Sequence, residues 1–149
     1  MALFEEIVEA ASHESPLWAA AALPTGVREQ LAVFSPLAPP VYELGLETVY
    51  EAYLVHYGRP RLFAPDGKTD RILLGDYLYA HGLVRIAEAG GVDAVAAMAE
   101  LISRCASLRA AGAPGDGVAW VDAARALGGD PDPHAVDQAM NRHLARVED

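Results

Sequence analysis

The sequence has little of several features that define common protein classes. It contains one cysteine, Cys105, so no disulfide can form within the chain, and a reducing compartment fits it. Lysine occurs once, at Lys68, and 11 basic residues stand against 21 acidic ones, which gives a net charge of −10. A surface of that sign repels phosphate backbones, so we expect no binding to nucleic acid.

Long apolar runs are also missing. The longest one, from Leu17 to Leu23, is too short to cross a bilayer and ends at Pro24. The N-terminal segment carries Glu5 and Glu6 where a secretory signal would need a positive charge and an unbroken apolar stretch. We therefore expect a cytoplasmic protein without a membrane span.

The apolar residues that are present recur at helical spacing. No segment alternates between apolar and polar residues for long enough to predict a strand, so we expect an all-α single-domain helical bundle of about six to seven helices. Turn-rich segments divide the chain into N-terminal helices (1–39), a helical core (40–110) and C-terminal helices (111–149). The expected helices cover residues 4–11, 25–34, 40–57, 70–89, 93–109 and 133–144.

Two of these helices, residues 70–89 and 93–109, have only narrow polar faces. A helix that is apolar all round is expected to be enclosed on every side, so we predict that residues 70–89 and 92–109 form the most buried elements. A chain of 149 residues has few helices with which to cover them. We therefore predict a homo- or hetero-dimer with the region from Tyr77 to Ala99 in its interface; an internal core filled by the chain itself is the open alternative.

The first of these helices carries a groove and a carboxylate. Gly75 and Gly82 lie seven residues apart on one face with Tyr79 between them, which predicts the close approach of a neighbouring helix. Asp76 stands beside this groove, and a buried carboxylate needs a partner, for which His56 and Arg104 are the candidates. The structural or interface candidates are Gly75, Asp76, Tyr77, Tyr79 and Gly82.

The run Leu74-Gly75-Asp76-Tyr77-Leu78, within an apolar helix followed by a helix of small residues, resembles the helix pair of polyprenyl diphosphate synthases. The similarity extends over about residues 43–110 and is closest to the non-catalytic small subunit of heterodimeric heptaprenyl diphosphate synthase. It implies a truncated isoprenoid-synthase-like bundle that partners a catalytic prenyl synthase subunit in isoprenoid chain elongation.

One departure from the family pattern concerns metal binding. In catalytic members the preceding helix ends in a histidine followed by paired aspartates that bind magnesium, whereas here Tyr57 and Gly58 follow His56. Tyrosine and glycine supply no carboxylate oxygens for a hard cation. The resemblance thus implies no catalytic residue, no metal and no cofactor in this chain, with magnesium expected only in a catalytic partner, and a protein that is inactive alone.

Several other residues allow both a structural and a functional interpretation. Arg59, Arg61 and Lys68 concentrate positive charge in one loop of an acidic protein, where they could contact a phosphate or a partner's carboxylates. Glu43, Glu47 and Glu51 recur every four residues and are interpreted as a solvated helix face rather than a metal site. Structural interpretations are also favoured elsewhere. Cys105 is interpreted as an inert buried thiol, His81 as a packing residue, and Trp18 and Trp120 as packing or interface anchors.

Two function hypotheses follow. The first is a non-catalytic or regulatory subunit that completes a catalytic synthase and walls off the tunnel for the growing isoprenoid chain. The second is a stand-alone helical homodimer that binds a small apolar ligand, or an enzyme of unrecognised type. A companion synthase with both aspartate-rich motifs would favour the first, and a well-formed internal pocket the second.

Overall fold

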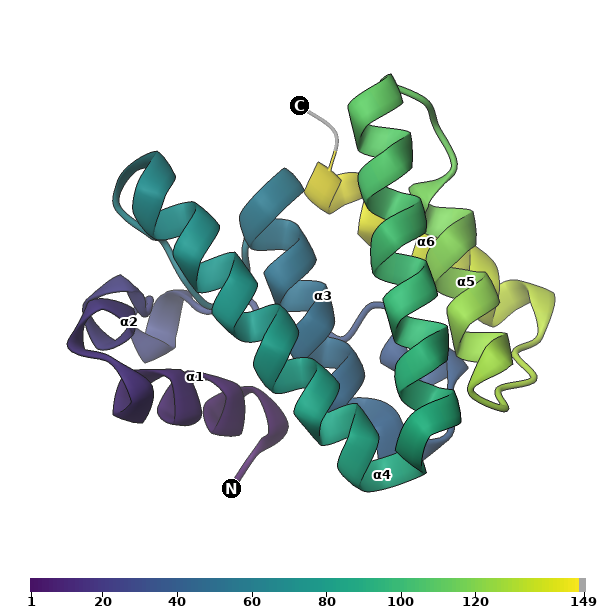
Figure 1. The fold of residues 1–149 in the computed structure, drawn as a ribbon, viewed down its shortest axis with the longest axis horizontal. Coiled ribbons are helices and arrows are strands. Elements are labelled where there is room, and N and C mark those ends of the chain that lie inside the picture. Colours follow the sequence, from purple (N-terminus) through teal and green to yellow (C-terminus); the bar gives the residue numbers. More distant parts are fainter. Residues whose placement is uncertain (148–149) are drawn as a thin grey trace.

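The computed structural model describes residues 1–147 and shows an all-α bundle (Figure 1). This part of the chain contains six α-helices and three short 3₁₀ turns, η1–η3, which follow one another between α2 and α3; the only β-type pairing found in it is an isolated bridge between Ala22 and Phe63. No helix among these residues is long and apolar enough to cross a membrane. The elements are α1 (Leu3–Glu14), α2 (Pro16–Ala21), η1 (Thr25–Val27), η2 (Ser35–Leu37), η3 (Pro40–Tyr42), α3 (Glu43–Tyr57), α4 (Gly67–Ala111), α5 (Asp116–Ala126) and α6 (Pro133–Val147).

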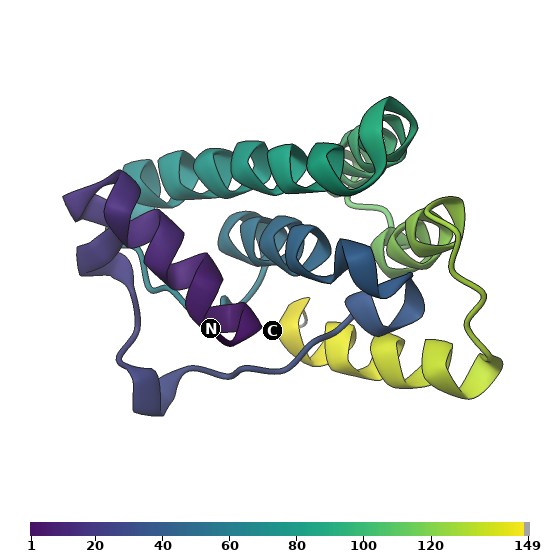
Figure 2. The same ribbon diagram turned by 90° about the horizontal axis from the view of Figure 1, so that it is seen from below.

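Helix α3 occupies the centre of the molecule. Figure 2 shows it between α4 on one side and α6 with the chain around η1 on the other. Every residue from Gly45 to Val55 is buried, including the polar ones. The prediction that residues 70–89 and 92–109 are the most buried helices is therefore wrong: α3 is enclosed on all sides, whereas α4 buries one face only.

Glycines bring α3 and α4 into close contact. A methyl group at Gly82 would lie 2.5 Å from Val49 Cγ2, one at Gly75 would overlap the His56 ring, and one at Gly45 would lie 2.7 Å from Ile86 Cδ1. The predicted close approach at Gly75 and Gly82 is confirmed. The neighbouring helix is α3 of the same chain, since the side chains that lie against Gly75 and Gly82 are those of His56 and Val49.

Helix α4 bends sharply at Gly91 (Figure 1). This residue has φ 70° and ψ −155°, a conformation that is costly for any residue with a side chain. The break expected between the helices 70–89 and 93–109 is therefore present as a kink between two helical halves. Both halves pack against the rest of the bundle, the first through Leu74, Leu78 and Ile86 and the second through Met98 and Leu101.

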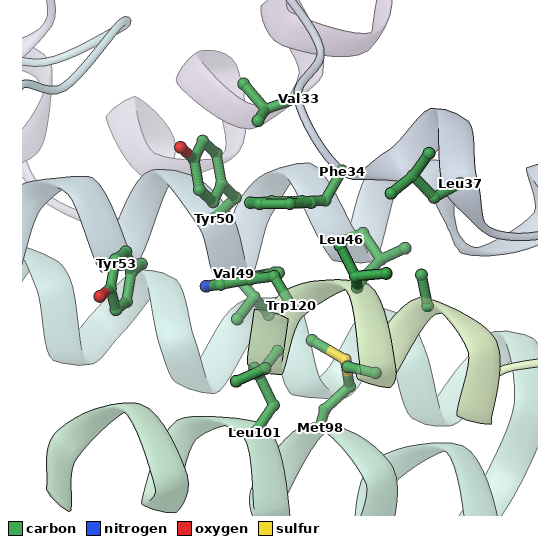
Figure 3. Packing of buried hydrophobic residues seen from close by; sticks show 14 of the residues in the cluster. Val33, Phe34, Leu37, Leu46, Val49, Tyr50, Tyr53, Met98, Leu101 and Trp120 are labelled. Atoms are coloured by element: carbon green, nitrogen blue, oxygen red, sulfur yellow. The ribbon is translucent and has the colours of Figure 1, made fainter. Parts of the chain in front are cut away.

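An aromatic cluster fills the core between α3 and α5 and reaches Met98 and Leu101 of α4 (Figure 3). The Phe34 ring stacks on Trp120 at a centroid distance of 5.4 Å, and Tyr50 meets Trp120 edge-on at 5.1 Å. Trp120 is thus a core residue, in agreement with the packing role expected for it. Burial of such large rings makes a major contribution to core stability.

The N-terminal third departs most from expectation. The helix predicted over residues 25–34 is reduced to the turn η1, after which the chain continues without regular secondary structure to η2. Residues Val33 and Phe34 still enter the core, where Phe34 packs against Tyr50. The chain here follows tertiary contacts rather than helical periodicity. At the other end of the chain, the Asp132 side chain caps α6, since its Oδ1 accepts a hydrogen bond from Ala135 N at 2.8 Å.

Candidate functional site

A buried ion cluster lies on the side of α3 that faces the loop after it. The Arg61 guanidinium donates to Glu47 Oε1 at 2.5 Å through Nη1 and to Glu51 Oε1 at 3.0 Å through Nε, and none of the three side chains is exposed. The interpretation of Glu47 and Glu51 as a solvated face is therefore wrong. Only Glu43, in the first turn of α3, is exposed.

Backbone groups complete the cluster. Glu51 Oε2 accepts the N–H groups of Arg61 at 3.1 Å and Leu62 at 2.9 Å, while Glu47 Oε2 accepts the N–H of Ser35 at 3.2 Å. The two carboxylates thus fix the irregular segments on either side of α3, which have no helical partners for these amides. Because Arg61 is enclosed and fully used, its side chain is not available to an external phosphate.

A second polar network centres on Asp116 at the start of α5. Its Oδ2 accepts hydrogen bonds from Tyr53 Oη at 2.5 Å, Arg109 Nη2 at 2.8 Å and His143 Nε2 at 3.0 Å. The His143 Nδ1 lies 2.8 Å from the Tyr50 hydroxyl, which donates to the neutral ring when Nε2 carries the proton. Four elements, α3, α4, α5 and α6, meet at this carboxylate.

The environment of this network shifts its acid–base equilibria. Burial opposes ionisation of Asp116, but the hydrogen bonds from His143 and Tyr53 and the charge of Arg109 outweigh this effect and hold the Asp116 pKa well below its usual value. Burial raises the pKa of both Tyr50 and Tyr53, so their hydroxyls stay protonated. Tyr50 and His143 are fully buried, so the network is a structural junction rather than a site that a substrate reaches.

Cys105 lies near this junction. The residue is buried, and burial raises the pKa of its thiol to about 12. A thiol in this state carries almost no thiolate at neutral pH and is a poor nucleophile. This agrees with the interpretation of Cys105 as a chemically inert buried thiol.

Asp76 does not sit where the sequence suggested. Its side chain is 67% exposed, and its Oδ1 lies 3.4 Å from His56 Nε2. His56 is thus the partner, whereas Arg104 pairs with Asp122. Burial lowers the pKa of His56 despite the opposing charge of Asp76, and the ring stacks on Tyr79 at 5.1 Å.

Tyr77 and His81 form a separate pair on the first half of α4. The Tyr77 hydroxyl lies 2.7 Å from His81 Nδ1, and the two rings meet edge-on at 5.5 Å. Tyr77 also contacts Trp18, whose ring is 6.4 Å away. These contacts join α4 to α2 and agree with the packing role expected for His81.

A basic depression opens beside the end of α3. It has a volume of about 440 Å³ and is lined by His56, Tyr57, Gly58, Arg59, Arg71, Arg146 and Val147. Of the three basic residues predicted to contact a phosphate or a partner, only Arg59 is at this depression, while Lys68 is exposed in the first turn of α4. No pattern in the sequence indicated Arg146, which is 87 residues from Arg59 and whose Nη1 donates to the Arg59 carbonyl.

An exposed apolar row runs along the side of α4 that faces away from α3. Its members Leu73, Ala80, Val84 and Ala87 recur at intervals of seven, four and three residues, which places them on one helix face. Leu73 is 48% exposed and Val84 is 53% exposed. At Ala87 the row meets an open apolar hollow of about 380 Å³ around the kink, lined also by Gly91, Val92, Val95 and Ala96, with Val92 84% exposed.

No family model, curated protein or solved structure matches this chain. Two surface features lie outside the buried polar clusters, namely the basic depression and the apolar row with its hollow. In the structure Leu74, Gly75 and Leu78 face α3 and are buried, while Asp76 points outward at the edge of the apolar row.

Proposed function

We propose that this protein is a non-catalytic helical subunit that associates with a catalytic polyprenyl diphosphate synthase and modulates isoprenoid chain elongation. The observation that carries the proposal is the exposed apolar row on α4 with the hollow at its end. An exposed apolar surface on the outer face of a long helix is typical of a protein–protein interface. The row lies within residues 43–110, the part that resembles the synthases.

The small side chains of the row favour another helix as its occupant. Ala80 and Ala87 expose little more than their methyl groups, and Gly91 has no side chain, so a partner helix can approach α4 closely. Val84 and Val92 then offer larger apolar surfaces to either side. An apolar contact of this kind also fits the low share of charged residues, 21%, in the chain.

The end of α3 supports a non-catalytic role. Where catalytic synthases carry paired aspartates, this chain has Tyr57 and Gly58, and the nearby side chains of Arg59 and Arg71 are positive. A divalent cation would be repelled here rather than coordinated. The contribution of this subunit would then be a surface that shapes the product tunnel of the partner.

The proposal is tested by reconstitution with the polyprenyl synthase of the same genome that carries both aspartate-rich motifs. Elongation from an allylic diphosphate is assayed with the synthase alone, with added wild-type protein, and with the Val84→Glu variant. We expect the wild type to change the rate or product length and Val84→Glu to have no effect. Products that are identical in all three reactions would overturn the proposal.

A further inference from the structure

We propose that the basic depression at the end of α3 binds a small, multiply charged oxyanion of the phosphate or diphosphate class, without a metal. The depression gathers residues from separate parts of the chain: His56 and Tyr57 at the end of α3, Arg59 in the following loop, Arg71 in α4 and Arg146 in α6. This inference does not depend on the proposed subunit role.

Only some of the basic residues around the depression form an ion pair with a carboxylate. Arg146 pairs with Glu29, and Asp76 lies against His56. Within residues 1–147, Arg59 and Arg71 form no ion pair and their guanidinium groups make no hydrogen bond with another residue. Two arginines that have no ion pair among the described residues therefore line one hollow, in a protein whose net charge is −10.

The chemistry of these groups indicates the class of ligand. A guanidinium group donates two parallel hydrogen bonds to the oxygens of a phosphate, and two such groups match an anion with at least two negative charges. Tyr57 belongs to the same lining, and its side chain carries a hydroxyl that can act as a neutral donor. A monocarboxylate would leave one of the two positive charges without a counter-charge.

A purely structural role explains only part of the arrangement. The carboxyl end of α3 is the negative end of its helix dipole, so Arg59 and Arg71 are favourably placed beside it. This interaction accounts for positive charge near the helix end but requires no hollow of about 440 Å³. An anion that enters the hollow is attracted by the arginines and not by the helix, so its binding should depend on both guanidinium groups.

The test is calorimetric titration of the full-length protein with sodium pyrophosphate at low ionic strength, with inorganic phosphate and acetate titrated in parallel. The variants are Arg71→Gln and Arg59→Gln, and the matched control is Lys68→Gln, which removes the same charge from the same helix as Arg71 but outside the lining. We expect saturable binding of pyrophosphate at one site, weakened about tenfold in each arginine variant and less than about twofold in the control.

Other outcomes would overturn the proposal. These are the absence of saturable pyrophosphate binding, equal weakening by Lys68→Gln and Arg71→Gln, or full binding by the double variant of Arg59 and Arg71. Sedimentation with vesicles that contain phosphatidic acid, without binding of free pyrophosphate, would assign the surface to a membrane and likewise overturn it. Circular dichroism of each variant confirms that it is folded. A variant that loses anion binding but still joins the synthase would show that anion binding and association with the synthase are independent of each other.

Discussion

Arg61 Nη1 donates to Glu47 Oε1 at 2.5 Å in the interior of the protein, where neither side chain is exposed. The same guanidinium group reaches Glu51, so one positive charge stands against two carboxylates. The excess negative charge is spread over the backbone N–H groups of Ser35 and Leu62, among others. The cluster therefore ties α3 to the segments before and after it.

Arg61→Met is expected to destabilise the protein by about 3–5 kcal/mol, because it leaves two buried carboxylates without a counter-charge. The matched control is Arg125→Met, since Arg125 forms an ion pair with Asp122 at the surface, where both side chains are about half exposed. Its cost should be no more than about 1 kcal/mol. Urea unfolding followed by circular dichroism measures both. Equal losses in the two variants would contradict the role assigned to the cluster.

Gly82→Leu tests the close contact between α3 and α4. The added side chain would have to enter space held by Val49, so we expect a loss of about 1–3 kcal/mol in unfolding free energy. Gly26→Leu is the control, because no heavy atom lies within 4 Å of a methyl group at that position. A Gly82→Leu protein as stable as the wild type would show that the helices do not pack as described.

Asp116 should make stability depend on pH in the acid range. Its folded-state pKa lies below the ordinary value of about 4, so its ionised form stabilises the folded protein above pH 4. That contribution is lost as the pH falls below 4 towards the folded-state pKa. Asp116→Asn should be less stable at pH 7 and should lose less stability than the wild type between pH 4 and pH 3. Denaturant midpoints at both pH values measure this; parallel curves would contradict it.

The isolated protein should not catalyse prenyl transfer. Tyr57 and Gly58 offer no carboxylates for magnesium, and the arginines beside them repel it. Incubation with magnesium, an allylic diphosphate and isopentenyl diphosphate is expected to give no elongated product, while a catalytic synthase in the same buffer does. Elongation by a preparation free of host synthase would disprove this prediction.

The sequence predicted the all-α class because helical spacing is repeated along most of the chain, and it predicted the groove at Gly75 and Gly82 because glycine inside a helix indicates close packing. It failed for Glu47 and Glu51. Carboxylates four residues apart ordinarily mark a solvated face, and their partner Arg61 lies in a loop whose path depends on tertiary contacts. The signal present was the otherwise apolar composition of α3, which predicts a helix enclosed on all sides.

The basic depression could be predicted only in part for the same reason. Arg59 stood out as one of several positive residues in a loop, but Arg71 and Arg146 were placed beside it by the packing of α4 and α6 against α3. For the apolar row, the sequence predicted more burial than the structure shows. The composition of residues 72–87 predicted deep burial, whereas the structure buries only the face with Leu74, Leu78 and Gly82 and leaves Leu73 and Val84 outside.

The most direct test of the proposed association is the molar mass measured by light scattering after size-exclusion chromatography, for the protein alone and mixed with the catalytic synthase of the same genome. Val84→Glu is compared with Val118→Glu, a valine on α5 that is 49% exposed and lies outside the α4 row. We predict a complex with the summed mass for the wild type and Val118→Glu, and none for Val84→Glu. A wild-type protein that stays at 15.8 kDa in both samples, or a Val84→Glu variant that forms the complex as the wild type does, would contradict the account.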